Sequence, residues 1–422
     1  MTYDIAVESL VARIPKHWRA LPFRRLAALL DVANTGKSAP LLSLASTGVV
    51  APREEFNGLG RQMPSDETIG RYWLAKPDDL IVNPMWLIGG GIGVSAVSGA
   101  VSPDYRVYRL GPDLHPRYVH HLLRSQPYRD QYKLYTRADT TFDRRVSKVD
   151  FHAMPILVPP LAEQRRIADF LDTETARIDH LVTLQQKVRF SVEARTTAQL
   201  NLTIDKLREE YGTLPFRRMI WSIEQGSSPQ CHNFPADAEN WGVLKVSAVK
   251  NGAFWEDENK QLPDGIPPDL RYEIKHGDLL ITRANTPQLV GAAAVASAPR
   301  GKLMLCDKIF RVATTGDLLP DYLVLVSLGA RIRDMCAEAS HGTSQSMANL
   351  KTEEIKRWPI PAAPVPVQEE TVRELTAARE HAASLNAAID NQLRLLAERR
   401  QAVITAAVTG VADVMTAGGV TA

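Results

Sequence analysis

The sequence predicts an α+β protein with a pseudo-two-fold internal repeat, in which two mixed α/β domains alternate with two long helices. Two observations predict this fold. A proline-rich segment that opens a long helical stretch occurs at residues 155–164 and again at 359–368, a shift of 204 residues. Both helical stretches carry apolar residues at heptad spacing. A repeat that fills about half the chain indicates two whole domains rather than a solenoid.

The shift between the two copies varies along the chain. Residues 21–26 return at 214–219, a shift of 193, while Asp79 corresponds to Asp278, a shift of 199. From Pro116 and Pro320 onward the shift stays at 204. The second copy has therefore gained 11 residues, all of them before Pro320. A fixed scaffold with a diverged middle predicts two domains that carry different recognition surfaces.

Size and composition restrict the class of protein. The chain has 422 residues, which indicates more than one domain, and its 45% hydrophobic and 23% charged content is typical of a globular protein. No apolar run reaches the roughly 18 residues that span a bilayer. The three scattered cysteines do not form a disulfide pattern, and we expect a reducing cytoplasm. A net charge of +2 does not by itself indicate nucleic-acid binding.

We divide the chain into five parts. These are a first α/β domain at 1–154, a central helical arm at 155–212, a second α/β domain at 213–358, a C-terminal helical arm at 359–412 and a flexible tail at 413–422. Short β-branched runs predict strands at 79–82, 91–97 and 105–110, and a helix at 118–125. The second copy predicts strands at 241–246, 278–282, 292–296 and 308–313, and a helix around 322–337.

The helical arms carry two rows of heptad positions. The central arm has no Pro or Gly from Glu163 to Glu210. Its first row is Leu171, Ile178, Gln185, Val192 and Gln199, and a second row with an offset of three is Leu181 and Val188. The C-terminal arm repeats this with Leu375, Ala382, Ile389, Leu396 and Val403, and with Leu385 at the offset of three. We expect an antiparallel coiled coil, which serves as a structural hairpin, a docking surface or both.

Motifs for catalysis and cofactor binding are incomplete. Residues 83–86 partly match the Asn-Pro-Pro-aromatic loop of amino-methyltransferases, but Met85 interrupts the match and no donor-binding unit precedes it. The glycines at 89–93 lack the Gly-Lys-Ser/Thr of a phosphate loop. His and Cys residues show no metal-ligand spacing. We therefore expect no catalytic, cofactor-binding or metal-binding residues in this chain.

The chain resembles the specificity subunits (HsdS family) of type I restriction–modification systems. The resemblance rests on residues 159–172 and 396–410, on residues 14–18, on Leu42-Ser43 and on residues 277–283, and it covers nearly the whole chain. One departure is Val367-Gln368, where the family has Glu-Gln. At that position we expect weaker capping of the helix.

The resemblance implies a non-catalytic, sequence-specific DNA-binding subunit that serves DNA methylation and host defence. Each α/β domain would be a target recognition domain for one half of a bipartite site in double-stranded DNA. The diverged domains predict an asymmetric site. The helices would set the spacer and dock two adenine-methyltransferase (HsdM-type) subunits, which hold S-adenosylmethionine, and motor-nuclease (HsdR-type) subunits can join. The docking candidates are Leu171, Ile178, Leu181, Val188, Leu385, Ile389, Leu396 and Val403.

Candidate DNA contacts follow from the chemistry of bases and phosphates. Arg, Lys, Asn and Gln read base edges, and Arg, Lys, Ser and Thr bind phosphates. The first domain offers Arg61, Arg71, Arg144, Arg145 and Lys148. The second offers Lys245, Lys250, Asn251, Arg283, Asn285, Lys302 and Lys308. Thr343, Ser344 and Gln345 belong to a polar loop that resembles a position where the family touches DNA.

Two other functions stay open on sequence grounds. A self-sufficient DNA methyltransferase would bind the methyl donor itself, and the missing donor-binding unit argues against it. A coiled-coil scaffold unrelated to DNA would show no salt-sensitive, sequence-specific DNA binding.

Overall fold

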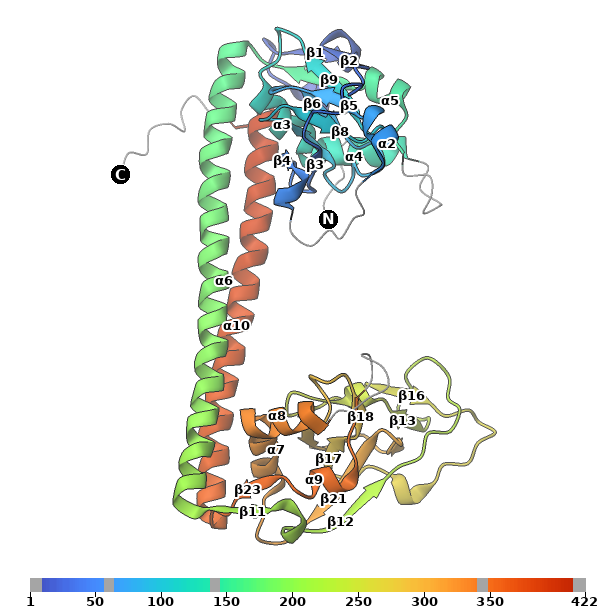
Figure 1. The fold of residues 1–422 in the computed structure, drawn as a ribbon, viewed down its shortest axis with the longest axis vertical. Helices are drawn as coiled ribbons and strands as arrows, with labels where there is room; N and C mark the ends of the chain where they lie inside the picture. Colours follow the sequence, from blue (N-terminus) through green and yellow to red (C-terminus); the bar gives the residue numbers. More distant parts are fainter. Residues whose placement is uncertain (1–9, 57–63, 137–144, 340–347, 413–422) are drawn as a thin grey trace. The chain divides into compact units, whose positions relative to one another are not determined.

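The computed structural model describes residues 10–56, 64–136, 145–339 and 348–412. The chain forms two compact units: unit 1 comprises Met1–Gln185 and Asp390–Ala422, and unit 2 comprises Gln186–Ile389. Two long helices, α6 (Leu161–Tyr211) and α10 (Val365–Val408), each contribute one part to unit 1 and one part to unit 2 (Figure 1). The predicted tail at 413–422 lies outside the described residues.

Unit 1 is built on a four-stranded antiparallel sheet with the order β2-β9-β6-β7. Its strands are β2 (Ala27–Leu30), β9 (Arg106–Leu110), β6 (Leu80–Val82) and β7 (Ile92–Val94). All three residues of β6 are buried, as expected for a central strand covered on both faces. Three strand pairs accompany this sheet: β1 (Arg19–Pro22) with β10 (Pro155–Val158), β3 (Leu42–Leu44) with β4 (Val50–Pro52), and β5 (Trp73–Ala75) with β8 (Gly99–Val101).

Unit 2 repeats this topology. Its main sheet has the order β12-β21-β17-β19, formed by β12 (Ile220–Gln225), β21 (Ile309–Thr314), β17 (Leu279–Thr282) and β19 (Ala293–Val295). β11 (Thr213–Pro215) pairs with β23 (Pro359–Pro361) as β1 does with β10. The identical strand order confirms the internal repeat that the sequence predicts.

Unit 2 contains three further groups of short strands. A three-stranded sheet contains β16 (Asn259–Gln261), β13 (Gly242–Leu244) and β20 (Leu303–Met304). Two short pairs are β14 (Val249–Lys250) with β15 (Ala253–Phe254), and β18 (Ala284–Asn285) with β22 (Ala348–Asn349). The three-stranded sheet gives unit 2 a surface that differs from that of unit 1.

Shorter helices cover the sheets. Unit 1 has α2 (Asp66–Gly70), α3 (Pro116–Arg124), α4 (Gln126–Tyr135) and α5 (Lys148–Ala153), and unit 2 has α7 (Pro320–Leu328), α8 (Ala330–Ala339) and α9 (Thr352–Ile355). The single helix predicted around 322–337 is two helices, because Gly329 takes an extended conformation with ψ 147°. The 3-10 turns are η1 (Val11–Arg13), η2 (Phe23–Arg25), η3 (Arg53–Glu55), η4 (Phe216–Arg218), η5 (Val246–Ala248) and η6 (Leu270–Tyr272).

A buried glutamine near the start of each long helix ties that helix to its globular domain. Gln164 is fully buried, accepts the backbone N–H of His115 at 2.8 Å, and donates to the carbonyls of Asp113 and Pro159, both at 2.8 Å. In unit 2, Gln368 is equally buried. It accepts the N–H of Leu319 at 2.9 Å and donates to the carbonyls of Asp317 and Ala363, both at 2.8 Å. Every partner is shifted by the same 204 residues.

The residue before each glutamine is Glu163 in the first copy and Val367 in the second. This difference does not change the capping of the two helices. Gln164 and Gln368 both donate their backbone N–H to a proline carbonyl at 3.0 Å, so the first turn is the same in α6 and α10. The carboxylate of Glu163 instead accepts hydrogen bonds within unit 1 from the His17 ring at 2.9 Å and the Trp18 indole at 3.1 Å. Val367 packs on the core of unit 2. The expectation of weaker capping was therefore wrong.

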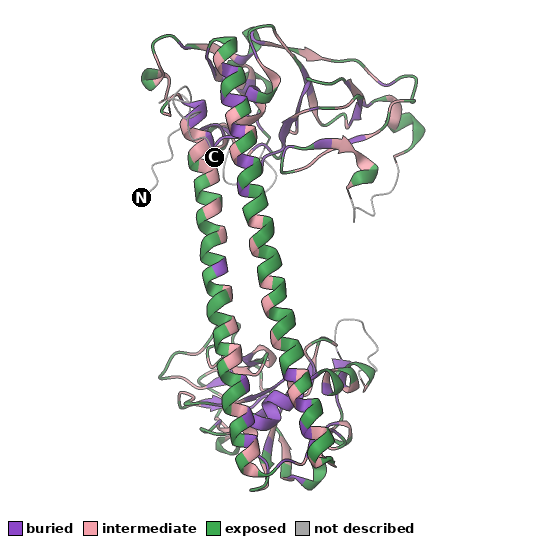
Figure 2. Cartoon of the chain, turned by 90° about the vertical axis from the view of Figure 1, so that its left-hand side faces the viewer, coloured by how far each residue is buried: buried purple, intermediate pink, exposed green. Residues whose placement is uncertain are grey.

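The burial pattern along the long helices corrects one of the two predicted heptad rows. Leu171, Ile178 and Ile389 are buried, and Leu396 and Val403 are half-buried, as the first row predicts, whereas Gln199 of that row is exposed. The predicted second row is exposed: Leu181 by 37%, Val188 by 49% and Leu385 by 40%. Between residues 181 and 199 the half-buried positions of α6 are Gln185 and Val192 of the first row, together with Val182, Arg189 and Thr196. The second row therefore follows the first by four residues, not three. Figure 2 shows half-buried residues alternating with exposed ones along both long helices.

The two helices run antiparallel within each unit. In unit 1, Ile167 and Leu171 of α6 share a core with Ile404 and Val408 of α10, while Glu174, further along α6, meets the earlier Arg399 at 3.7 Å. In unit 2, α6 residues Leu200 and Ile204 cluster with Leu375, whereas Leu207 joins the core packed by Val367 and Val372. In the described residues, no helix combines the length and apolar content that a membrane crossing requires.

We predict that Gln164→Ala and Gln368→Ala each lower the free energy of unfolding by about 2–4 kcal/mol, because each leaves a partly buried backbone N–H and two carbonyls without their partner. Gln199→Ala, on an exposed face of α6, is the matched control and should change it by less than about 0.5 kcal/mol. Urea unfolding checks both values. A loss at Gln164 or Gln368 no larger than the loss at Gln199 would contradict the prediction.

Candidate nucleic-acid interface

A basic cavity in unit 2 gathers three lysines. It has a volume of about 410 Å³, and its walls come from the segment after β12, from β13 and η5, from β16, and from the turn before β21. Lys245, Lys260 and Lys308 line it together with Ser228 and Asp307. Three ammonium groups around one hydroxyl and one carboxylate give the cavity a net positive charge, which suits a phosphate group.

Local hydrogen bonds fix the floor of this cavity. The Ser228 hydroxyl donates to the Asp307 carboxylate and accepts the N–H of Asp307 at 3.1 Å, which joins two segments 79 residues apart. Lys245 reaches Glu258 at 3.4 Å. Two thiols also line the cavity; burial raises the pKa of Cys306 to about 11 and raises that of Cys231. Both thiols are neutral near pH 7, so they do not offset the charge of the lysines.

The loop between β17 and β19 lies next to the cavity. The N–H of Arg283 donates to the Lys308 carbonyl at 2.8 Å, and the Arg283 carbonyl accepts the N–H of Leu350 at 2.9 Å. Asn285 follows in β18, and its side-chain oxygen accepts the N–H of Thr286 at 2.8 Å. The structure thus brings the predicted residues Lys245, Arg283 and Asn285 into one region with Lys308.

Unit 1 has an equivalent loop between β6 and β7. The carbonyl of Pro84 accepts the N–H of Val146 at 3.1 Å, as the carbonyl of Arg283 accepts that of Leu350 in unit 2. The exposed Arg145 precedes Val146, and Arg106 donates to the Val146 carbonyl at 3.0 Å. Arginines therefore lie beside this loop, as lysines lie beside the β17–β19 loop of unit 2. The side chains of the β6–β7 loop itself, however, are those of Met85 and Trp86, both exposed.

An arginine braces this loop of unit 1 from behind. Arg124 of α3 donates to the carbonyls of Gly90 at 2.6 Å, Ile92 at 3.0 Å and Ser46 at 3.0 Å, so it holds the loop and the β3–β4 hairpin together. Burial and the neighbouring Arg129 lower the pKa of Arg124 to about 10, which still leaves it charged at pH 7. It lines an 850 Å³ cavity, but its donors are already occupied by backbone carbonyls. We assign it a positioning role.

The hairpin tip beside Arg124 needs glycine. Gly48 has φ +84°, and a Cβ there would collide with the Arg124 guanidinium. In unit 2 the β14–β15 hairpin has Gly252 with φ +79°, and the Asn251 carbonyl accepts a hydrogen bond from Arg379 of α10 at 2.6 Å. The same brace is therefore supplied by α3 in unit 1 and by α10 in unit 2.

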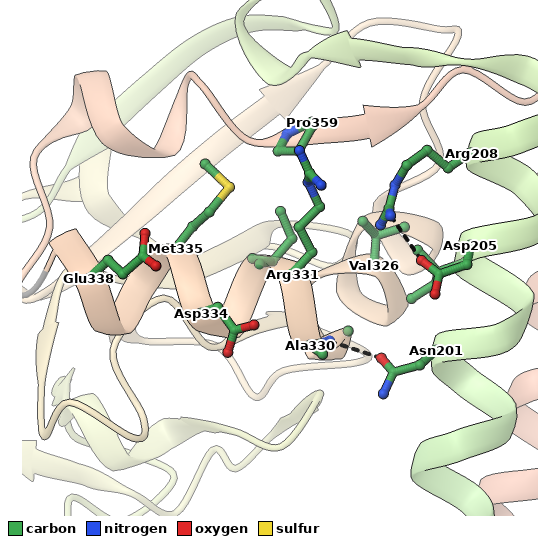
Figure 3. Close-up of a pocket in the computed structure, with 13 residues that line it drawn as sticks. Asn201, Asp205, Arg208, Val326, Ala330, Arg331, Asp334, Met335, Glu338 and Pro359 are labelled. Atoms are coloured by element: carbon green, nitrogen blue, oxygen red, sulfur yellow. Dashed lines mark hydrogen bonds and ion pairs between the residues drawn. The ribbon is translucent and has the colours of Figure 1, made fainter.

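A second cavity of unit 2, about 580 Å³ in volume, lies between α8 and α6 (Figure 3). Asn201 accepts the N–H of Ala330 at 2.9 Å, so it caps α8, and Arg208 is paired with Asp205 at 2.9 Å. The other charged groups are Arg331, Asp334 and Glu338. Its two arginines are outnumbered by three carboxylates, so this cavity does not favour a polyanion. The cavity lined by Lys245, Lys260 and Lys308, called the lysine cavity below, is the better candidate for phosphate.

The remaining predicted contacts are dispersed or lie outside the described part. Arg71 pairs with Glu67 at 2.8 Å, and Lys148 is exposed at the start of α5. Lys250 and Asn251 form the hairpin tip that contacts α10, and Lys302 donates to the Glu239 carbonyl at 2.7 Å outside the lysine cavity. Outside the described residues are Arg61, Arg144, Thr343, Ser344 and Gln345.

Sequence reasoning missed Lys260, Ser228 and Arg106. Lys260 lies in a short polar strand and Ser228 in a loop, and only the fold brings them to the same cavity. Within the described ranges no group of three or more His, Cys, Asp or Glu is arranged to hold a metal ion. The Asn83 side chain accepts the N–H of Met85 at 3.1 Å, so it stabilises its own loop.

Comparison with curated proteins finds specificity subunits. The chain is 34% identical over 152 residues to the specificity subunit of the type I restriction enzyme EcoEI from Escherichia coli, a match that covers 36% of this chain and 26% of that protein. It is 23% identical over 306 residues to the EcoKI specificity subunit from Escherichia coli strain K12, which covers 69% of this chain and 65% of that protein. The matches thus span less than two thirds of either relative. No protein-family model matches the sequence.

Solved structures share the fold over nearly the whole chain. A chain from a type I R-M system, studied for complex assembly and conformational transition, has a TM-score of 0.71 at 17% identity and covers 94% of this chain and 98% of its own. The HsdS subunit from Thermoanaerobacter tengcongensis has a TM-score of 0.53 at 18% identity, with the same coverage. In sequence, this chain is therefore similar to specificity subunits of type I restriction enzymes, and it shares the fold of a solved HsdS subunit.

Proposed function

We propose that this chain is the non-catalytic DNA-recognition subunit of a type I restriction–modification complex, and that each unit reads one half of an asymmetric bipartite site. The observation that carries the proposal is the pair of equivalent loops. Each unit holds a loop at the equivalent place in its four-stranded sheet, with arginines at its base in unit 1 and lysines in unit 2. The loop side chains differ, which supports two different half-sites.

The partners follow from the surface of the long helices. Leu181, Leu184 and Val188 on α6 and Leu385 and Leu395 on α10 are exposed apolar residues. We propose that such residues dock two adenine-methyltransferase subunits, which supply S-adenosylmethionine, and that motor-nuclease subunits join for cleavage. Leu171, Ile178 and Ile389 are buried within the chain and contribute to internal packing instead. A cytoplasmic location fits three cysteines that form no disulfide.

The alternatives have less support. A self-sufficient methyltransferase needs a donor-binding unit, and the Asn83 side chain, the one motif residue that suggested catalysis, is used within its own loop. A scaffold unrelated to DNA does not account for three lysines around one cavity.

Methylation mapping tests the proposed function directly. We expect cells that contain this chain with its methyltransferase partner to carry methyladenine in a two-part, non-palindromic motif, and cells without this chain to lack that motif. Single-molecule sequencing of genomic DNA measures it. If the same motif were methylated in both strains, or no new motif appeared, this chain would not direct methylation.

The lysine cavity predicts salt-dependent binding. Changing Lys245, Lys260 and Lys308 together to Gln should reduce the slope of log K against log salt by about 1 to 3, because each lost phosphate contact removes about 0.9 from it. Lys302→Gln, outside the cavity, is the control and should leave the slope unchanged. Titration of the complex with duplex DNA at several salt concentrations measures the slope. Equal slopes for the triple variant and the control would place the phosphates elsewhere.

A further inference from the structure

Two large apolar side chains are exposed on the β6–β7 loop of unit 1. Trp86 is 60% exposed and Met85 is 41% exposed. The Met85 side chain has no polar hydrogen-bonding group, and that of Trp86 has only the indole N–H. The corresponding loop of unit 2 carries Arg283 and Asn285, which are suited to hydrogen bonding.

Backbone hydrogen bonds fix the loop, and the Trp86 indole packs on it. The backbone N–H of Trp86 donates to the Asn83 carbonyl at 3.0 Å, and the Trp86 carbonyl accepts the backbone N–H of Gly91 at 2.8 Å. The indole lies against Gly89: a Cβ on Gly89 would come within 2.6 Å of its Cε3 atom. Arg124 braces the carbonyls of Gly90 and Ile92. A rigid, exposed aromatic anchor loses little conformational entropy on binding.

The surroundings of the loop identify a polyanion as its occupant. Arg145 is exposed beside Val146, which is hydrogen-bonded to Pro84, and Arg106 reaches the Val146 carbonyl. A protein surface of opposite charge would also suit these arginines, but the equivalent place in unit 2 carries the lysine cavity that fits phosphate. The apolar group that DNA displays on a base edge in the major groove is the thymine methyl.

We propose that Met85 and Trp86 are specificity-determining residues that contact a thymine 5-methyl group in the half-site of unit 1. This inference rests on the proposed function. It gives the two units different chemistries: apolar contact in unit 1, and hydrogen bonds from Arg283 and Asn285 in unit 2. The half-site of unit 1 therefore contains at least one thymine whose methyl group matters for binding.

Uracil substitution tests the methyl contact. The complex of this chain with its methyltransferase is titrated with duplexes that replace each thymine of both half-sites, one at a time, by uracil. For the wild-type chain we expect one substitution, in one half-site only, to weaken binding about three- to tenfold. For Trp86→Ala we expect the thymine duplex to bind about as weakly as the uracil duplex does to wild type, with no further loss on uracil.

Two further variants separate the contact from general effects. Gly89→Ala keeps the tryptophan but displaces its indole, and it should reduce the preference for thymine over uracil. Trp221→Ala removes a 79% exposed tryptophan from β12 in unit 2 and should keep the preference. Thermal unfolding of each variant shows that the chain still folds.

Specific outcomes overturn the inference. It fails if wild type is indifferent to every uracil substitution, or if Trp86→Ala weakens thymine and uracil duplexes by the same factor, as a wedge between bases would. It also fails if Trp86→Ala leaves the binding of both duplexes unchanged. The proposed function fails differently: the wild-type complex would then bind all duplexes alike, whatever their sequence.

Discussion

The two buried glutamines, Gln164 and Gln368, are the constraint on which the rest of the structure depends. Each uses both ends of its amide to join the first turn of a long helix to the strand that precedes it and to the turn before α3 or α7. A buried amide with all its partners fixes orientation, because any rotation would leave backbone groups unpaired. The start of each arm is thereby locked to its own domain.

This lock allows the loops to differ without loss of the scaffold. The two four-stranded sheets have the same strand order. Tyr118 and Tyr322, at equivalent positions, donate to carbonyls of β10 at 3.0 Å and of β23 at 3.3 Å. The arginine that supports the hairpin differs between the units, because Arg124 comes from α3 and Arg379 from α10. Recognition chemistry can therefore change at the loop while its position in the unit is kept.

The sequence was informative where a feature repeats. The duplication predicted two similar units, and the first heptad row was correct at Leu171, Ile178 and Ile389, which are apolar and buried, but not at the polar, exposed Gln199. The second row was wrong because half-buried positions such as Arg189 and Thr196 are polar, whereas Leu181 and Val188 are apolar and exposed. Heptad analysis follows hydrophobicity, which here does not follow burial.

The candidate site was predictable only in part. Lys245, Arg283 and Asn285 were identified by residue type, and the fold brought them together. Lys260 could not be distinguished from a solvated lysine, because its partners in the cavity come from three other segments of the chain. Apolar residues in a loop, such as Met85 and Trp86, do not fit a search for hydrogen-bonding side chains.

The central claim is that each unit reads its own half of the target. The most direct measurement exchanges residues 20–150 for the same segment of another family member and maps methylated adenines in cells. If each unit reads its own half-site, one half-site changes while the other half-site and the spacer stay as they were. A change in both half-sites would contradict it.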